Sequence, residues 1–445
     1  MKKILVLGAG LVAKPLIRHL LSKNYMVTVA SNTPDRAMEM VNAHPNGTVI
    51  SWEIKDEEML GELVSEHDLT VSLLPYVFHL TVAHQCVLYK KNMVTTSYVK
   101  PEMQKLDGAA KRAGIIILNE TGLDPGIDHM SAMRIIDHVH DKGGEIEEFY
   151  SICGALPAPE AADNPLKYKF SWSPKGVVLA GNNDAKYLKE GREVFIPTRD
   201  LFKDPLRVDF PSIGPMDIYP NRDSISYIDV YGIPEVKTIC RGTFRFPGWC
   251  ETLDAIKQLN LISQDKIDMT GLTYAGLVAR LIGGKEIADI KSMAASHLGL
   301  DVDAKAIKAM EWLGLFENTL MNRGEDSPFE VTSDLMISKM GLGENERDMV
   351  VMQHTFMASY PDGRAEVIRS RMLDFGSPAT DTSIARTVAL PAAIAVEMIL
   401  EGQIQEKGVY RPVLPGIYNP ILTALESLGI RMEEEYGLPL SERLT

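Results

Sequence analysis

The sequence predicts an α/β fold in which the first 125 residues form a doubly wound parallel sheet. Six short apolar runs alternate there with segments whose apolar residues recur every three or four positions. The runs are continuously apolar, which is typical of strands covered by helices on both faces. A glycine-rich turn, VLGAGLVA, joins the first run to the first helical segment. Together these features predict a Rossmann-type domain.

The elements of this domain follow one another at short intervals. The predicted strands lie at residues 3–8, 26–31, 48–52, 69–75, 92–98 and 115–120. The helical segments between them lie at residues 16–23, 34–43, 56–67, 79–91 and 101–114. The N-terminus imitates a secretory signal, but an amphipathic helix continues at once, so a strand, turn and helix are favoured.

The pattern changes after Asp128. We expect a helix at 129–144, a strand at 145–157, strand-like pieces from 165 to about 248 and mostly helices from about 249 to 317. Residues 347–376 read as a hairpin whose turn is PDG. Residues 383–404 form a long apolar helix, which we expect to pack on the first domain. No run approaches ~18 unbroken apolar residues, so no membrane span is expected.

Composition excludes several function classes. The 445 residues carry a net charge of −14, which argues against nucleic-acid and anionic-membrane surfaces. The four cysteines (Cys86, Cys153, Cys240 and Cys250) have no CxxC spacing, so we expect neither a disulfide framework nor a zinc knuckle. The chain reads as cytoplasmic.

The glycine turn is the first functional signal. Gly8, Gly10 and Ala13 follow the G-x-G-x-x-G/A pattern between a strand and a helix. Gly8 permits the tight turn, Gly10 lets a pyrophosphate approach the backbone, and a small residue at 13 lets helix and strand pack closely. The alternative is a tight turn in a domain that has lost its coenzyme.

The end of the second strand decides between NAD and NADP. An acid there would bind the ribose 2′-OH of NAD, but this chain has Ser31, Asn32 and Thr33, with Arg36 one turn later. These side chains can donate hydrogen bonds or charge to a 2′-phosphate. NADP is therefore favoured, with NAD not excluded.

Longer motifs carry a family resemblance. They are TTSYVKP (95–101), GLDPGIDH (122–129), ALPAPEAADNPLKYKFSWSPKG (155–176), YPNRDS (219–224), RGTFR (241–245) and NERDMVVMQH (345–354). In this order they resemble the NADP-dependent, L-glutamate-forming saccharopine dehydrogenases, also called saccharopine reductases. The likeness covers almost the whole chain.

The resemblance implies a reaction and an architecture. Saccharopine, NADP and water would give glutamate, 2-aminoadipate 6-semialdehyde and NADPH by hydride transfer through an imine. It implies a homodimer whose chain has a Rossmann domain (1–125 plus about 385–445), an α/β substrate-binding and dimerisation domain (126–248 plus about 326–384) and a helical inserted domain (249–325).

The resemblance also implies site residues by position. Coenzyme contacts are implied at Gly10, Leu11, Val12, Ala13, Ser31, Asn32, Thr33, Leu74, Thr96, Ser97, Leu123, Asp124, Pro125 and Ser173. Substrate contacts are implied at Ser97, Tyr98, Asp124, Arg222, Thr243, Phe244 and Arg245. Asn32 departs from the family, which commonly has an arginine there to clamp the 2′-phosphate.

The residue types alone point to similar chemistry. A substrate with several carboxylates needs guanidinium groups, which bind carboxylate through two parallel hydrogen bonds, and Arg222 and Arg245 fit this need. The alternative for Arg222 is an ion pair with Asp223. Amine oxidation needs a base for the ammonium proton, and the candidates are Asp124, Tyr98 and Cys153. Cys153 reads more readily as a small buried residue.

The stretch NETGLDPGIDHM (119–130) contains two acids with different expected roles. Asp124 is expected to bind or react. Asp128 precedes a helix and is expected to cap it, worth ~1 kcal/mol, and His129 then lies in the first turn. We expect no metal site.

The sequence leaves two rival functions. A related imine reductase, such as a carboxynorspermidine dehydrogenase-like enzyme, would want acids where saccharopine wants arginines. A catalytically silent NADP sensor is the rival from another class. The presence of Arg222 and Arg245 disfavours the first, and the retention of Tyr98, Asp124 and Arg222 disfavours the second.

Overall fold

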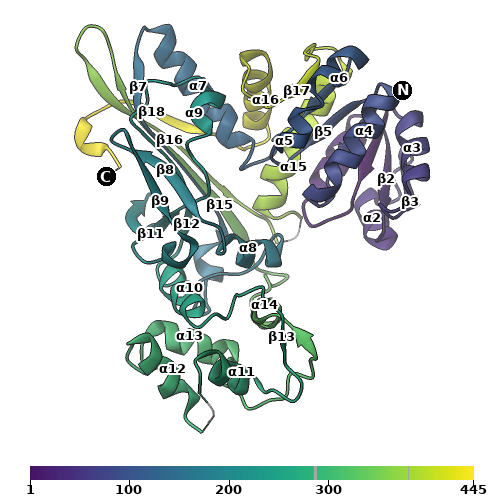
Figure 1. The fold of residues 1–445 in the computed structure, drawn as a ribbon. Helices are drawn as coiled ribbons and strands as arrows, with labels where there is room; N and C mark the ends of the chain where they lie inside the picture. Colours follow the sequence, from purple (N-terminus) through teal and green to yellow (C-terminus); the bar gives the residue numbers. More distant parts are fainter. Residues whose placement is uncertain (285–287, 379, 445) are drawn as a thin grey trace. The chain divides into compact units, whose positions relative to one another are not determined.

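The computed structural model describes residues 1–284, 288–378 and 380–444, and the chain divides into two compact units (Figure 1). The first unit comprises Met1–Ile146, Val230–Gly232 and Met357–Arg443. The second comprises Glu147–Asp229, Ile233–Phe356 and Leu444–Thr445. The boundaries of the three domains expected from the sequence stay a prediction.

A parallel sheet is the centre of the first unit. Its strands are β1 (Lys3–Leu7), β2 (Met26–Ser31), β3 (Gly47–Ser51), β4 (Leu69–Ser72), β5 (Asn92–Thr95), β6 (Ile116–Leu118) and β17 (Gly408–Tyr410). Their order is β17-β6-β5-β4-β1-β2-β3, and every pair is parallel. The order reverses between β1 and β4, which is the point where Rossmann sheets bind ligands. The predicted fold class is confirmed.

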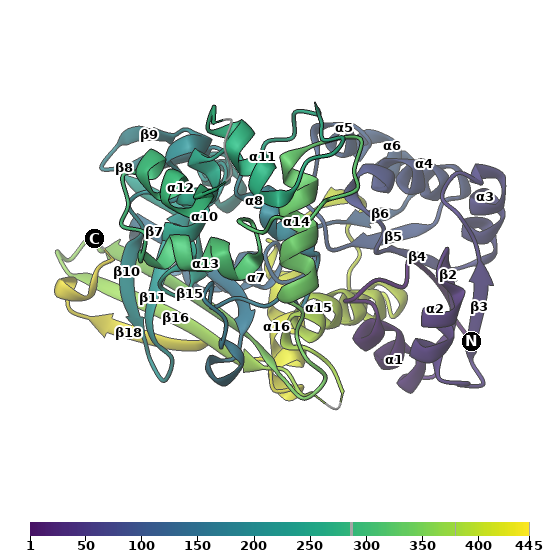
Figure 2. The same cartoon turned by 90° about the horizontal axis from the view of Figure 1, so that it is seen from below.

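Helices cover both faces of this sheet. The helices of the first unit are α1 (Lys14–Ser22), α2 (Pro34–Val41), α3 (Glu57–Glu66), α4 (His79–Tyr89), α5 (Pro101–Gln104), α6 (Asp107–Ala113), α7 (Ile127–Asp141), α15 (Ser383–Leu400) and α16 (Pro415–Ser427). In Figure 2, α4 and α6 lie on one side of β4–β6, while α1 and α15 lie on the other. Leu5 and Leu7 pack in the cluster that contains Leu60, Val82 and Met93.

The long apolar helix α15 packs against α1, β4 and β5, as its composition predicted. Its mean hydropathy of 1.6 and its 18 residues would suit a membrane span. However, 78% of it is buried inside the protein, and this burial accounts for its apolar composition.

The first unit also contains an antiparallel pair of strands. β16 (Ala365–Phe375) pairs with β18 (Glu433–Leu438), with an irregularity between Val367 and Arg369. The turn before β16 closes through a hydrogen bond from Tyr360 N to Arg364 O (2.9 Å), where PDG was predicted to turn the chain. The sequence reasoning did not predict β17 or β18.

The second unit has a mixed sheet. Its strands include β7 (Glu145–Pro157), β8 (Ala185–Lys189), β9 (Arg192–Ile196), β10 (Leu206–Phe210), β11 (Gly214–Pro220), β12 (Thr238–Arg245) and β15 (Asp348–Ser359). The order is β10-β11-β12-β7-β15, with β8 on β12 and β9 on β8. β12 is parallel to β7 and antiparallel to β11. Short helices α8 (Pro174–Ala180) and α9 (Tyr227–Tyr231) interrupt the predicted strand-rich segment.

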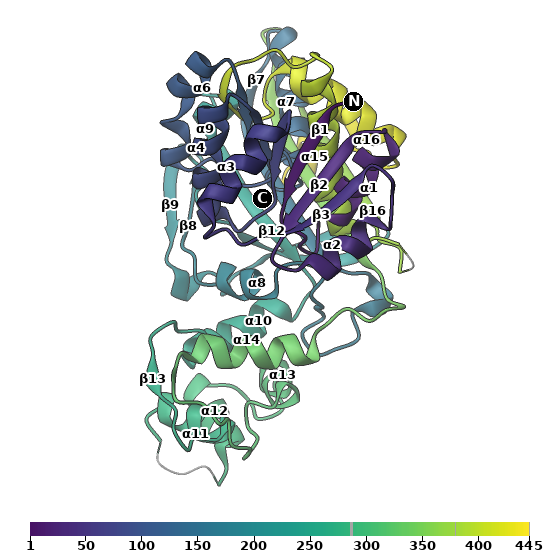
Figure 3. The same ribbon diagram turned by 90° about the vertical axis from the view of Figure 1, so that its right-hand side faces the viewer.

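A group of helices follows Gly248 in the second unit. They are α10 (Trp249–Gln258), α11 (Tyr274–Leu281), α12 (Ile290–Leu298), α13 (Lys305–Leu313) and α14 (Pro328–Lys339), accompanied by the strand pair β13 (Ile267–Asp268) and β14 (Glu325–Asp326). Figure 3 shows α10–α14 gathered together. The predicted helical character of this stretch is confirmed. Apolar residues that recur along α10 and α13, such as Ile256 and Met310, form its core.

Candidate active site

The turn after β1 is shaped for a phosphate. Gly8 has a φ of +101°, and a Cβ there would lie 3.2 Å from the carbonyl oxygen of Leu73. A Cβ on Gly10 would meet nothing within 4 Å, so its backbone lies open. Ala13 is fully buried and caps α1 without a side-chain hydrogen bond. The first N–H groups of α1 can therefore bind a pyrophosphate. Leu11 is half exposed and Val12 partly buried beside them.

The end of β2 presents hydroxyl and amide groups. Ser31 is buried, and its Oγ accepts a hydrogen bond from Thr33 N (3.1 Å) and lies 3.0 Å from Thr33 Oγ1. Asn32, Thr33 and Arg36 are exposed. No carboxylate occupies the position that would bind a ribose 2′-OH, which agrees with the sequence reading.

The ends of β4 and β5 are joined by a histidine that the sequence analysis did not single out. His79 Nδ1 lies 2.8 Å from Ser72 Oγ, and Nε2 lies 2.8 Å from Ser97 Oγ and 3.3 Å from Thr95 Oγ1. Burial lowers the pKa of His79 to about 4, so its ring is neutral at neutral pH. The Ser97 hydroxyl is therefore held in place by an uncharged ring. Leu74, which follows β4, would lie 3.6 Å from a Cβ on Gly8.

The GLDPG loop is packed tightly against the end of β5. A Cβ on Gly126 would lie 2.0 Å from Gly122 O, and a Cβ on Gly122 would lie 3.1 Å from Thr96 Cβ. Gly126 has a φ of +148°, and the Asp124–Pro125 peptide bond is cis. From Ile115 to Met133, all described, Asp124 is the one residue that is not buried. Leu123 and Pro125 belong to the buried set.

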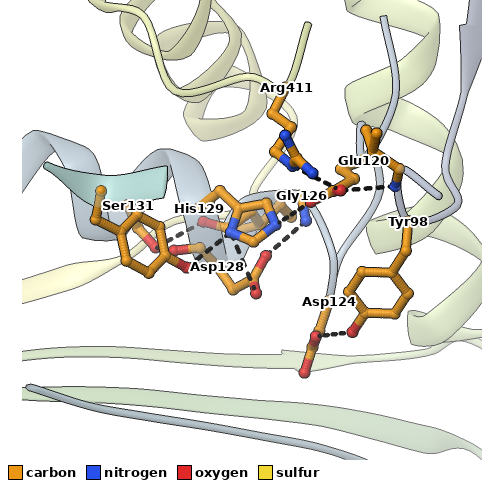
Figure 4. Close-up of polar contacts among 11 residues, drawn as sticks. Tyr98, Glu120, Asp124, Gly126, Asp128, His129, Ser131 and Arg411 are labelled. Carbon is orange, nitrogen blue, oxygen red and sulfur yellow. Dashed lines mark hydrogen bonds and ion pairs between the residues drawn. The ribbon is translucent and has the colours of Figure 1, made fainter. Parts of the chain in front are cut away.

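Asp124 is paired with Tyr98. The Tyr98 hydroxyl donates a hydrogen bond of 2.9 Å to Asp124 Oδ1 (Figure 4). Tyr98 comes from the segment after β5 and Asp124 from the segment after β6, so both lie at the carboxyl edge of the sheet. The structure thus brings together a carboxylate and a phenol, two of the three predicted proton carriers.

A buried ionic network lies behind this pair, and the sequence reasoning missed it. Glu120 Oε1 accepts hydrogen bonds from Val99 N (2.8 Å) and Arg411 Nε (2.9 Å), and Oε2 lies 2.7 Å from His129 Nε2 (Figure 4). His129 Nδ1 lies 2.8 Å from the Tyr231 hydroxyl. No local signal in the sequence marks Arg411 as a partner of Glu120, because 291 residues separate them.

The predicted roles of Asp128 and His129 need adjustment. Helix α7 begins at Ile127, with Gly126 as its N-cap and no side-chain cap. The prediction that Asp128 precedes and caps the helix is wrong: it lies in the first turn, and its Oδ1 accepts a hydrogen bond of 2.6 Å from Gly126 N. His129 lies in the first turn, as predicted, and is fully buried. Among the described residues no group of three acidic, histidine or cysteine side chains is arranged to hold a metal.

In the second unit, Arg245 lies in an aromatic enclosure. Its guanidinium carbon lies 5.0 Å from the Tyr168 ring centroid, 5.4 Å from Trp249 and 5.8 Å from Tyr219. Only 4% of the residue is exposed. Nη1 donates to the carbonyl of Phe244 (2.8 Å), but within the described chain Nε has no partner, and neither has the buried Trp249 Nε1. Unpartnered buried donors beside a cation are the condition for binding an anion.

Arg222 and Arg245 lie at opposite ends of the same strand pair. Arg245 is opposite Asp217 in the β11–β12 register, whereas Arg222 follows the end of β11 at Pro220. Three residues of strand, roughly 10 Å, separate the level of Asp217 from that of Pro220. Arg222 is exposed and has a φ of +54°. Asp223, its proposed ion-pair partner, accepts hydrogen bonds from two backbone N–H groups in the following turn.

Four other predicted residues of the second unit have different surroundings. Thr243 is partly buried on β12 and is in register with Cys153 on β7. Phe244 is fully buried, so only its backbone is available to a ligand. Cys153 is 7% exposed, and its thiol is not part of a disulfide. Ser173 is the exposed N-cap of α8. The ligand contacts assigned to all these residues stay predictions.

Two family models match the chain. Residues 4–118 match the saccharopine dehydrogenase NADP binding domain, and residues 122–430 match the saccharopine dehydrogenase C-terminal domain. The boundary between the matches falls just before the GLDPG loop.

Characterised proteins from fungi and animals are similar over the same length. The chain is 38% identical to the NADP(+), L-glutamate-forming saccharopine dehydrogenase of Schizosaccharomyces pombe, across 98% of this chain and 99% of that protein. It is 38% identical to the mitochondrial alpha-aminoadipic semialdehyde synthase of Bos taurus, across 96% of this chain but 47% of that protein. The chain thus spans about half the length of the bovine synthase.

A solved structure has the same fold. The apo, histidine-tagged, L-Glu-forming saccharopine dehydrogenase of Saccharomyces cerevisiae is similar with a TM-score of 0.89 and 35% identity. The match covers 98% of this chain and all of that one.

Proposed function

The chain belongs to the saccharopine dehydrogenase family, and we propose that it is an NADP-dependent oxidoreductase acting on saccharopine. It interconverts saccharopine, NADP and water with glutamate, 2-aminoadipate 6-semialdehyde and NADPH. The observation that carries the proposal is the Tyr98–Asp124 hydrogen bond at the carboxyl edge of a dinucleotide-binding sheet. Asp124 is the polar group of its loop that reaches the surface.

The residues of the first unit fit the coenzyme. The open backbone at Gly10 and the uncapped N-terminus of α1 suit the pyrophosphate, and Ser31 and Thr33 suit a 2′-phosphate. NADP, when bound, accepts the hydride from the carbon next to the amine nitrogen. Asn32 lacks the charge of the arginine common in the family, so phosphate binding here relies on neutral donors and on Arg36 nearby.

The protein's own residues move the protons. The Asp124 carboxylate takes a proton from the substrate ammonium, which frees the nitrogen lone pair for imine formation. The Tyr98 hydroxyl, which donates a hydrogen bond to Oδ1, orients this carboxylate. Water then adds to the imine carbon, and the carbinolamine collapses to the aldehyde and the glutamate amine. The Asp124–Tyr98 pair takes up and returns protons both when water adds to the imine and when the carbinolamine collapses.

Arg245 and Arg222 bind the carboxylates of the substrate. Arg245 supports this role because its Nε is unpartnered in the described chain, inside an aromatic enclosure that raises the strength of a charged hydrogen bond. Neither rival function gains support from the comparisons. A carboxy-polyamine substrate has fewer carboxylates than saccharopine, so it would not need two arginines.

The test is a coenzyme and substrate screen followed by absorbance of the reduced nicotinamide. We expect NADP reduction only when saccharopine is added, with a smaller response for NAD. Asp124→Asn should lower the rate of reduction about 100-fold or more, whereas Asp362→Asn, which changes an exposed acid in the β15–β16 turn, should leave it unchanged. Reduction with a carboxynorspermidine-type substrate alone would favour the related imine reductase. NADP binding without turnover on any substrate would favour the sensor.

We also propose a homodimer in the cytoplasm, with no nucleic-acid or membrane partner. The family resemblance supports the homodimer, and the net charge of −14 supports the last two points. Light scattering after size-exclusion chromatography tests the dimer. A monomeric mass across the working concentration range would contradict it.

A further inference from the structure

Glu120 is a buried acid that the proposed chemistry does not use. It lies just after β6, is 1% exposed, and has a φ of +57°, a left-handed backbone conformation that residues with a Cβ rarely adopt. Such a residue persists only where its surroundings hold it in place. The question is what this carboxylate holds.

Its contacts join separate parts of the first unit (Figure 4). Oε1 accepts from the N–H of Val99, the residue after Tyr98, and from Arg411 Nε. Oε2 accepts from the Nε2–H of His129 on α7, at 2.7 Å. The backbone N–H of Glu120 donates to Ser97 O (3.1 Å). One side chain therefore ties the loop after β5, the start of α7 and the segment after β17.

The carboxylate stays ionised despite its burial. Burial favours the protonated form, but the hydrogen bond and charge of His129, the charge of Arg411 and the Val99 N–H together lower the pKa of Glu120 below its ordinary value. The network therefore keeps its hydrogen bonds throughout the neutral pH range.

The contacts of Glu120 lie next to both members of the Tyr98–Asp124 pair in the sequence. Val99 is adjacent to Tyr98, and Glu120 lies four residues before Asp124 on the same loop. We propose that Glu120 is a positioning residue that sets the hydrogen bond between Tyr98 and Asp124 by holding their two loops together. The inference rests on the proposed function, because it assigns Glu120 to the proton-transfer step. A displacement of about 1 Å at a reacting group can slow a reaction about 100-fold.

A matched control exists in the same unit. Asp374 on β16 is also buried, at 7% exposed, and pairs with Arg386 Nη1 (3.1 Å) and with the Ser383 hydroxyl (2.6 Å). Within the described chain, the hydrogen bonds of Asp374 join it to Ser383 and Arg386 and do not reach the loop after β5 or the loop after β6. Asp374→Asn therefore removes a buried charge and weakens an ion pair with Arg386, but it leaves the contacts of Glu120 intact.

The kinetic experiment compares Glu120→Gln with Asp374→Asn in the full-length protein. Glu120→Gln should lower kcat for saccharopine oxidation 10- to 100-fold, while the KM values for NADP and saccharopine change less than threefold. Asp374→Asn should leave kcat within twofold. In an Asp124→Asn background, Glu120→Gln should cause almost no further loss, because the two residues act on one step. Equal fractional losses in both backgrounds would overturn the proposal.

Hydrogen exchange gives a readout that needs no turnover. Glu120→Gln should speed amide exchange in peptides spanning residues 95–99 and 119–127, and Asp374→Asn should not. Unchanged exchange in both peptides overturns the positioning role. If the wild type reduces no coenzyme with saccharopine, the proposed function fails. Faster amide exchange in Glu120→Gln would then show that Glu120 holds the two loops together but serves no proton transfer from saccharopine. The proposal as stated would fail together with the proposed function.

Discussion

Replacing Arg245 by methionine tests whether the buried guanidinium binds a substrate carboxylate. Methionine keeps an unbranched stem that can pack among Tyr168, Tyr219 and Trp249 but removes the charge and every donor. Within the described chain this guanidinium donates one hydrogen bond to the protein, to Phe244 O, and its Nε has no acceptor. Its hydrogen-bonding capacity is therefore largely unused before ligand binding.

The magnitude follows from that accounting. A charged hydrogen bond contributes about 1.5–3 kcal/mol, and leaving a buried ligand carboxylate without its partner costs about 3–5 kcal/mol. At 1.36 kcal/mol per factor of ten, kcat/KM for saccharopine should fall roughly 100- to 1,000-fold. Folding should respond in the opposite direction, because a buried charge with an unpartnered donor is itself unfavourable. The melting temperature should therefore stay the same or rise.

The assay pairs steady-state kinetics with thermal unfolding monitored by circular dichroism. Arg245→Lys is the companion variant, since it keeps the positive charge over the aromatic rings but lacks the planar fork. It should recover less than a tenth of the wild-type kcat/KM. A Met variant with wild-type kcat/KM would refute the reasoning, and so would a melting temperature lowered by many degrees, because either result would make Arg245 a structural residue.

Four further outcomes are expected. Tyr98→Phe removes the donor to Asp124, so kcat should fall about tenfold and the acid limb of the pH–rate profile should move to higher pH, as measured by initial rates from pH 5 to 9. Arg222→Ala should raise the KM for saccharopine, with ~2 kcal/mol or more lost; an unchanged KM would mean a structural arginine. Asn32→Arg should lower the KM for NADP relative to NAD, and an equal effect on both coenzymes would contradict 2′-phosphate contact. Burial lowers the pKa of His79 from 6.5 to about 4, so the unfolded chain binds the extra proton first, and stability should fall as pH drops from 6.5 towards 4. His79→Gln should flatten that part of the curve of free energy of unfolding against pH.

Local patterns were enough to predict the central sheet. β1 to β6 lie where the continuous apolar runs were found, and the helices lie where apolar residues recur every three or four positions. The periodicity works because it records which side of each segment is buried. β17 escaped prediction because three residues carry no period, and β18 because most of its residues are exposed.

Sequence motifs predicted part of the candidate site. The glycine turn and GLDPG marked two loops that favour glycine, because Gly8 has a positive φ and a Cβ on Gly126 would lie 2.0 Å from Gly122 O. The helix start at Ile127 shows the limit of this reasoning. A cap assignment depends on a single residue of register, and Asp128 falls inside the first turn rather than before it.

The sequence by itself therefore determined the α/β class, the dinucleotide turn and the residue types available for acid–base chemistry and for binding carboxylates. Only the tertiary structure decided which of them meet: Tyr98 with Asp124, Glu120 with Arg411, and Arg245 with three aromatic rings. The physical reason is range. The pattern of buried and exposed positions in a helix or strand can be read from residues close together in the sequence. The hydrogen bond between Glu120 and Arg411, 291 positions apart, depends instead on how the strands are ordered in the sheet.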